Sequence, residues 1–94
     1  MNRKHLIEKG EALLLMLEEE ATTGINQRTT TVSDEDLKYA LRELTQMLEN
    51  VKNSTVPSKD QMFPVLTDMV NKSWPVDAII SKEIITFEKL YLKL

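Results

Sequence analysis

Apolar residues recur at helical spacing through the last twenty residues of the chain, 75–94. The main stripe follows the 3.6-residue period of an α-helix and comprises Val76, Ile80, Ile84, Phe87, Tyr91 and Leu94. A thinner ridge with seven-residue spacing lies on roughly the opposite side of the same helix and comprises Ala78, Ile85 and Leu92. A helix that is apolar on two sides lies either at the centre of its domain or against another chain, and the pattern leaves both possibilities open.

Two longer helices are predicted before this segment. The first covers residues 2–22 and contains Gly10 within its apolar face, where we expect another helix to approach closely. Leu15 and Met16 fall outside the main stripe of this helix. The second helix begins after Ser33, whose hydroxyl can cap the first turn. Its stripe is the cleanest in the chain and comprises Leu37, Ala40, Leu41, Leu44, Met47, Leu48 and Val51.

Prolines delimit the two remaining helices. The third helix is expected to begin around residues 60–63, or to be longer and bent at Pro64, with Ser58 or Asp60 as its cap. It should end before Pro75, because a proline disfavours helical geometry in the residue that precedes it. The same proline is expected to open the last helix as its first residue.

The expected fold is therefore all-α, a small four-helix bundle that forms a single helical domain over residues 1–94. Its third helix is short or kinked at Pro64. The first connection, over residues 25–32, is long and could let the second helix cross the first. A three-helix arrangement with a distorted third segment is the alternative.

Composition argues against several classes of function. The net charge of −3 does not fit a nucleic-acid-binding protein, since such proteins carry a basic patch. The absence of cysteine excludes disulfide scaffolds, thiolate metal sites and cysteine nucleophiles. The only histidine is His5, so zinc sites of the usual kinds and histidine-based triads are excluded as well. The apolar run at 12–17 is too short for a signal peptide or a membrane span, and we expect a cytoplasmic protein.

Carboxylates are the remaining candidates for chemistry. Glu8 and Glu11 have a Glu-x-x-Glu spacing that resembles the first half of the magnesium-binding pattern of the all-α nucleoside triphosphate pyrophosphohydrolases. That resemblance implies two carboxylates holding magnesium around phosphates, but the second half of the pattern, Glu-x-x-Asp, occurs nowhere in the chain. Glu83 borders the apolar stripe of the last helix and is either a buried carboxylate or an outward-pointing flank residue. We expect no enzyme, no cofactor, no metal and no small-molecule substrate; a carboxylate-dependent small enzyme using Glu8 and Glu11 is the alternative.

Apolar residues outside the main stripes are the positive indication of a partner surface, because each helix of a monomeric bundle needs only one stripe. Trp74 either binds a partner, as tryptophan often does at hot spots, or plugs the end of the core. The acidic run 18–20 either docks a basic partner or is a solvated face. The candidate contacts are Leu15, Met16, Ala78, Ile85, Leu92, Trp74, Glu18, Glu19 and Glu20.

These patterns together predict a small, non-enzymatic, cytosolic regulatory or interaction protein. We expect it to act through helix-face contacts with a protein partner or by self-association, for example as a homodimer. An immunity protein that neutralises a toxin is the alternative, because bacteriocin immunity proteins are similar to this chain in length and in expected helix number. No sequence motif accompanies that similarity.

Overall fold

The computed structural model describes residues 3–23, 32–58, 63–75 and 77–94. Its helices are α1 (Arg3–Thr22), α2 (Asp34–Asn53), α3 (Val65–Ser73) and α4 (Ile79–Tyr91). No strand occurs in the described part of the chain. The predicted fold class is confirmed: the protein is a small all-α four-helix bundle with a short third helix. Most of the first connection, which was predicted to be long, lies outside the described residues.

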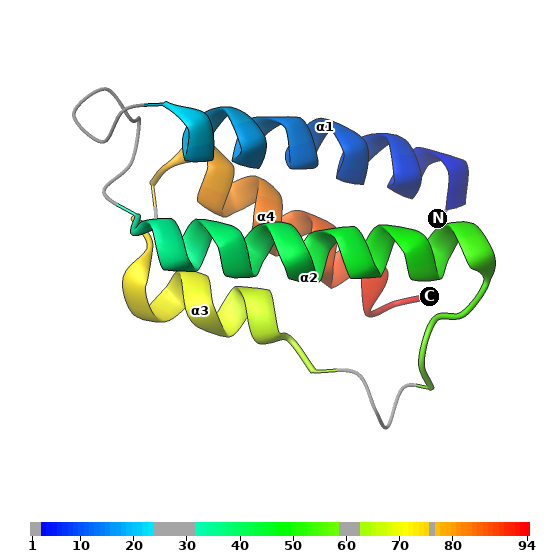
Figure 1. Ribbon diagram of the computed structural model, residues 1–94. Coiled ribbons are helices and arrows are strands. Elements are labelled where there is room, and N and C mark those ends of the chain that lie inside the picture. The colour runs from blue at the N-terminus through cyan, green and yellow to red at the C-terminus, as the bar shows by residue number, and fades with distance from the viewer. Residues whose placement is uncertain (1–2, 24–31, 59–62, 76) are drawn as a thin grey trace.

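Successive helices of the bundle run in opposite directions (Figure 1). The two long helices, α1 and α2, pack along each other. The end of α3 lies beside the beginning of α2, where the Ser73 hydroxyl donates to Asp36. In Figure 1, α4 lies behind α2, and it packs against α1 on one flank and α3 on the other. The last helix is therefore in contact with a neighbour on each flank, which is one of the two arrangements expected for a helix that is apolar on two sides.

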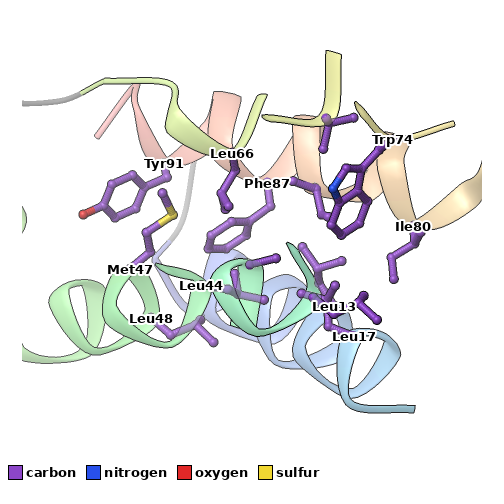
Figure 2. Close-up of a cluster of buried hydrophobic side chains, with 14 of the residues drawn as sticks. Leu13, Leu17, Leu44, Met47, Leu48, Leu66, Trp74, Ile80, Phe87 and Tyr91 are labelled. Atoms are coloured by element: carbon purple, nitrogen blue, oxygen red, sulfur yellow. The ribbon is translucent and has the colours of Figure 1, made fainter. Parts of the chain in front are cut away.

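Side chains from all four helices meet in one core (Figure 2). Phe87 of α4 points into the space between Leu44 of α2 and Leu66 of α3, and all three are fully buried. The close approach predicted at Gly10 is present, because a Cβ atom there would lie 2.7 Å from the Phe87 ring and closer still to Leu48. The glycine thus lets α1 approach α2 and α4 closely.

The beginning of α3 differs from the prediction. The helix begins at Val65, not around residues 60–63. Pro64 is the central residue of an inverse γ-turn, with φ −79° and ψ 60°, and the Val65 N–H donates to the Phe63 carbonyl at 2.8 Å. This turn leads directly into the first helical residue, so Pro64 precedes the helix and does not kink it. Ser58 lies seven residues before Val65 and does not cap α3, while Asp60 lies outside the described residues.

The beginning of α4 also differs from the prediction. Pro75 was expected as the first helical residue, but the helix begins at Ile79. Between them the chain makes a turn in which the Ala78 N–H donates to the Pro75 carbonyl at 3.3 Å. Ala78 has extended backbone geometry, with φ −69° and ψ 140°, which separates this turn from the helix.

A carboxylate of α4 stabilises the N-terminus of α3. Glu88 is fully buried, and its Oε2 accepts a hydrogen bond from the Leu66 N–H at 3.0 Å. Its Oε1 accepts a second from the Thr67 N–H at 2.7 Å. A negative charge is favourable there because the amides at a helix N-terminus are unpaired and the helix dipole is positive. Glu88 therefore acts as the cap of a helix to which it does not belong.

Candidate interaction surface

The outward face of α4 carries one exposed row of side chains. The row follows helical spacing and comprises Ile79, Lys82, Thr86 and Lys89 of α4, followed by Lys93 just after the helix ends. Ile79 has 72 % of its surface exposed, the largest fraction of any large apolar side chain in the described residues. The acidic residues that follow Ile79 in this helix lie outside the row, because Glu83 faces α1, with its carboxylate 3.8 Å from the Lys9 ammonium, and Glu88 is buried. The row is thus basic, with an apolar residue at its beginning.

The outward face of α1 carries an exposed row of opposite charge. This row comprises Glu8, Ala12, Leu15 and Glu19, which are spaced by four, three and four residues. Leu15 is 60 % exposed. Like the row on α4, it combines charges of one sign with a large exposed apolar side chain.

A pocket of about 350 Å³ lies between the end of α1 and the beginning of α4, near these two rows. Its lining is mainly apolar on the α4 side and partly acidic on the α1 side, and it comprises Met16, Glu19, Glu20, Thr23, Ala78, Ile79 and Ile80. Four predicted contact residues, Met16, Glu19, Glu20 and Ala78, are therefore brought together in one place. We call this pocket together with the two exposed rows the α1–α4 face.

The two other members of the predicted α4 ridge lie elsewhere. Ile85 and Leu92 are half-buried and pack against the core. Leu92 lines a hollow together with Phe63 and Val65, at the start of α3. Leu92 therefore lies toward the start of α3, and of the three ridge residues only Ala78 lines the pocket of the α1–α4 face.

Two predicted contact residues present little surface. Trp74 is 4 % exposed and belongs to the core at the end of α3, as in the alternative in which it plugs the core. Glu20 is 6 % exposed, although it also lines the pocket. Their burial restricts any contact to the few atoms that remain accessible.

The acids of the run 18–20 do not share one surface. Glu18 is exposed and lies beside Leu41 and Arg42 of α2, whereas Glu19 and Glu20 border α4. Asp36, near the start of α2, accepts a hydrogen bond from the Ser73 hydroxyl at 3.3 Å and so faces α3. The charges therefore point in several directions and do not form a continuous acidic patch.

The carboxylates of the alternative enzyme hypothesis are not assembled into a centre. Glu11 lies 4.0 Å from the Lys52 ammonium of α2, while Glu8 belongs to the exposed row described above. Within the described ranges, no three His, Cys, Asp or Glu side chains are grouped so that they could hold a metal ion. Nor does any helix among the described residues have the length and apolarity needed to cross a membrane.

Two large apolar residues were not identified from the sequence as exposed. Ile79 is one residue before Ile80, so it lies about 100° from the main stripe of α4, and this offset was the available signal. Phe63 lies within the span where the third helix was expected to begin, but it precedes α3 and is 66 % exposed. In both cases the direction of the core decides whether the apolar side chain is exposed.

The chain was compared with known proteins at three levels. It matches no protein-family model, no curated protein and no solved structure.

Proposed function

We propose that this protein is a small, non-enzymatic interaction protein that acts in the cytoplasm through contact of its α1–α4 face with a protein. The observation that carries the proposal is the exposure of Leu15 and Ile79 at 60 % and 72 % on neighbouring helices. Ile79 lines the pocket between α1 and α4, and Leu15 lies between Glu8 and Glu19 in the exposed row of α1, of which Glu19 also lines that pocket. Apolar anchors surrounded by charged side chains are typical of specific protein contacts, in which the apolar part supplies affinity and the charges supply orientation.

The same features support a regulatory role as part of this proposal. A protein that acts by occupying a surface needs no catalytic group, and a bundle of this size can present a rigid helix face. We therefore expect the activity of this protein to depend on shape and charge at the α1–α4 face and to be insensitive to the carboxylates Glu11 and Glu18, which lie toward α2.

A photo-crosslinking residue at position 79 tests the proposal in the cell that makes the protein. We expect a specific crosslinked protein product that is lost when Leu15→Asp is introduced as a second change. The same photo-reactive residue at Lys38, which is exposed on α2, is the control and should not give that product. Equal crosslinking from positions 79 and 38, or none from position 79, would refute the proposal.

A further inference from the structure

We propose that the protein bound at the α1–α4 face is a second copy of the same chain, forming a two-fold symmetric dimer. This inference rests on the proposed function, because it names the occupant of the same surface. The argument uses the charges of the two exposed rows, the directions of the helices and the positions of residues along them.

The two exposed rows are complementary in charge. The row on α1 contributes Glu8 and Glu19, and the row on α4 contributes Lys82 and Lys89. In the described structure none of these four side chains makes an ion pair within 4.0 Å. A single molecule cannot join the rows, because they lie on adjacent helices and both point outward. A second molecule can.

The directions of the helices permit this pairing. The helices α1 and α4 run antiparallel. A two-fold axis that is parallel to both helices therefore brings α1 of one copy alongside α4 of the other, and these two helices are again antiparallel. The same axis places α4 of the first copy along α1 of the second. Each charge contact is therefore made twice.

The positions along the helices bring opposite charges to the same level. Gly10 lies opposite Phe87 within one molecule, so Glu8 is within about one helical turn of the level of Lys89. At the other end Glu19 and Ile79 line the same pocket, so Glu19 is within about one turn of the level of Lys82. Rotation about this axis does not shift either copy along the helices. Glu8 of one copy therefore meets Lys89 of the other, and Glu19 meets Lys82.

Small and apolar side chains lie between the charges. Ala12 permits close approach on α1, and Met16 and Ile79 can cover each other across the axis. Like charges meet at both ends of the interface: Lys93 is level with Arg3 and Lys4 at one end, and Asp77 is close to the level of Glu19 at the other. These side chains are exposed at the rim, where salt screens their repulsion.

The size of the face sets the expected affinity. Two neighbouring helices and the length of α4, which has 13 residues, give a footprint of roughly 20 Å by 20 Å. This is at the small end of specific interfaces, so we expect a dissociation constant on the order of micromolar.

Sedimentation equilibrium across roughly 1 to 500 µM protein tests the inference, because this range spans the expected dissociation constant. We expect the average mass to rise from that of one chain to that of two, and no further. A mass of one chain throughout, or growth beyond two chains, would overturn the proposed dimer.

A charge exchange tests which surface forms the dimer. One variant carries Lys82→Glu and Lys89→Glu, and a second carries Glu8→Lys and Glu19→Lys. Each variant alone should dimerise at least about tenfold more weakly, because like charges then face each other in both halves of the interface. An equimolar mixture should form a one-to-one heterodimer, because every contact again joins opposite charges.

The control variant carries Lys38→Glu and Lys72→Glu, which make the same charge change at exposed positions of α2 and α3. It should dimerise like the unmodified chain. Circular dichroism and the fluorescence of the buried Trp74 verify that all variants are folded. Unchanged dimerisation of the exchanged variants, or a mixture that stays monomeric, would overturn the inference.

Failure of the dimer and failure of the proposed function are distinguishable. If the protein is monomeric and position 79 crosslinks to a different protein, the proposed dimer is wrong and the proposed interaction function stands. If the protein is monomeric and position 79 gives no crosslink, both the proposed dimer and the proposed interaction function are wrong.

Discussion

The helices α2 and α3 begin with caps of different origin. At the start of α2, the hydroxyl of Ser33 accepts a hydrogen bond from the Asp36 N–H at 3.2 Å. The carbonyl of the same serine accepts from the Leu37 N–H at 3.0 Å. Cap and helix are thus contiguous in the chain, and three acids in the first turn reinforce the start through the helix dipole.

At the start of α3, the first four amides have partners from three sources. The Val65 N–H donates to the Phe63 carbonyl, and the Asp68 N–H donates to the Pro64 carbonyl. The two amides between them belong to Leu66 and Thr67, and both donate to Glu88 of α4, which is 22 and 21 residues away in the sequence. Pro64 itself provides no side-chain cap.

This difference shows what each helix depends on. The start of α2 is specified by residues 33–37 alone, and the helix has 20 residues. The nine residues of α3 are too few to form a stable helix in water without tertiary contacts. We infer that α3 forms together with its contact to α4, and that Glu88 couples the two.

Replacing Glu88 with alanine should produce the largest effect. Two buried amides lose their acceptors and the missing side chain leaves a cavity, so we expect the free energy of unfolding to fall by about 2–4 kcal/mol. Urea denaturation followed by the fluorescence of Trp74, the only tryptophan, measures this loss. Amide hydrogen exchange at Leu66 and Thr67 should accelerate more than exchange at Asp36.

Glutamine at position 88 provides the graded control. Its side chain keeps one acceptor oxygen, so the expected loss is smaller, about 1–2 kcal/mol. If Glu88→Ala were no more harmful than alanine at the exposed Glu49 of α2, the proposed coupling of α3 to α4 would be wrong.

Replacing Ser33 with alanine tests the local cap. We expect a loss of about 1 kcal/mol, because one first-turn amide loses its acceptor while the neighbouring acids remain. Thermal or urea unfolding measures the change, and Ser58→Ala is the matched control because Ser58 is exposed and caps no helix. A loss equal to that of Glu88→Ala would remove the distinction between the two helix starts.

The same contrast explains what could be predicted about the fold. Ser33 was identified because its partner Asp36 is three residues away, within a local motif. Glu88 was not identified, because its pairing with α3 requires knowledge of how α4 packs. The starts of α3 and α4 were misplaced by a few residues because a proline can end a turn or open a helix, and local sequence does not decide between the two.

The proposed interaction surface was predictable to a similar extent. Leu15, Met16 and Ala78 were identified because they depart from the main stripe of their helices. Ile79 was not identified, and Ile85 was grouped with Ala78 although it packs against the core and does not line the pocket. Periodicity orders residues around one helix, but the positions of neighbouring helices determine which of those residues share a surface.

Replacing Ser81 with alanine tests whether a buried polar side chain stabilises the fold when it has no hydrogen-bond partner. Ser81 is fully buried on α4, as Glu88 is, but its hydroxyl has no hydrogen-bond partner among the described residues. Removing an unpaired buried hydroxyl should leave stability unchanged or raise it by up to about 1 kcal/mol. Thr86→Ala, at an exposed position of the same helix, measures how much of any gain comes from helix propensity. A clear destabilisation by Ser81→Ala would show that the hydroxyl is paired in solution.

A double-mutant cycle on Lys9 and Glu83 should give the smallest effect. The Glu83 carboxylate lies 3.8 Å from the Lys9 ammonium, and the two side chains are 42 % and 32 % exposed. Solvent screens such a pair, so we expect a coupling energy below about 0.5 kcal/mol that declines as salt is added. Urea unfolding of Lys9→Met, Glu83→Gln and the double variant measures this coupling. A coupling as large as the loss caused by Glu88→Ala would show that an exposed ion pair between α1 and α4 contributes as much as the buried cap of α3. The expected small value would instead show that, of two carboxylates on one helix, the one with buried backbone partners determines stability.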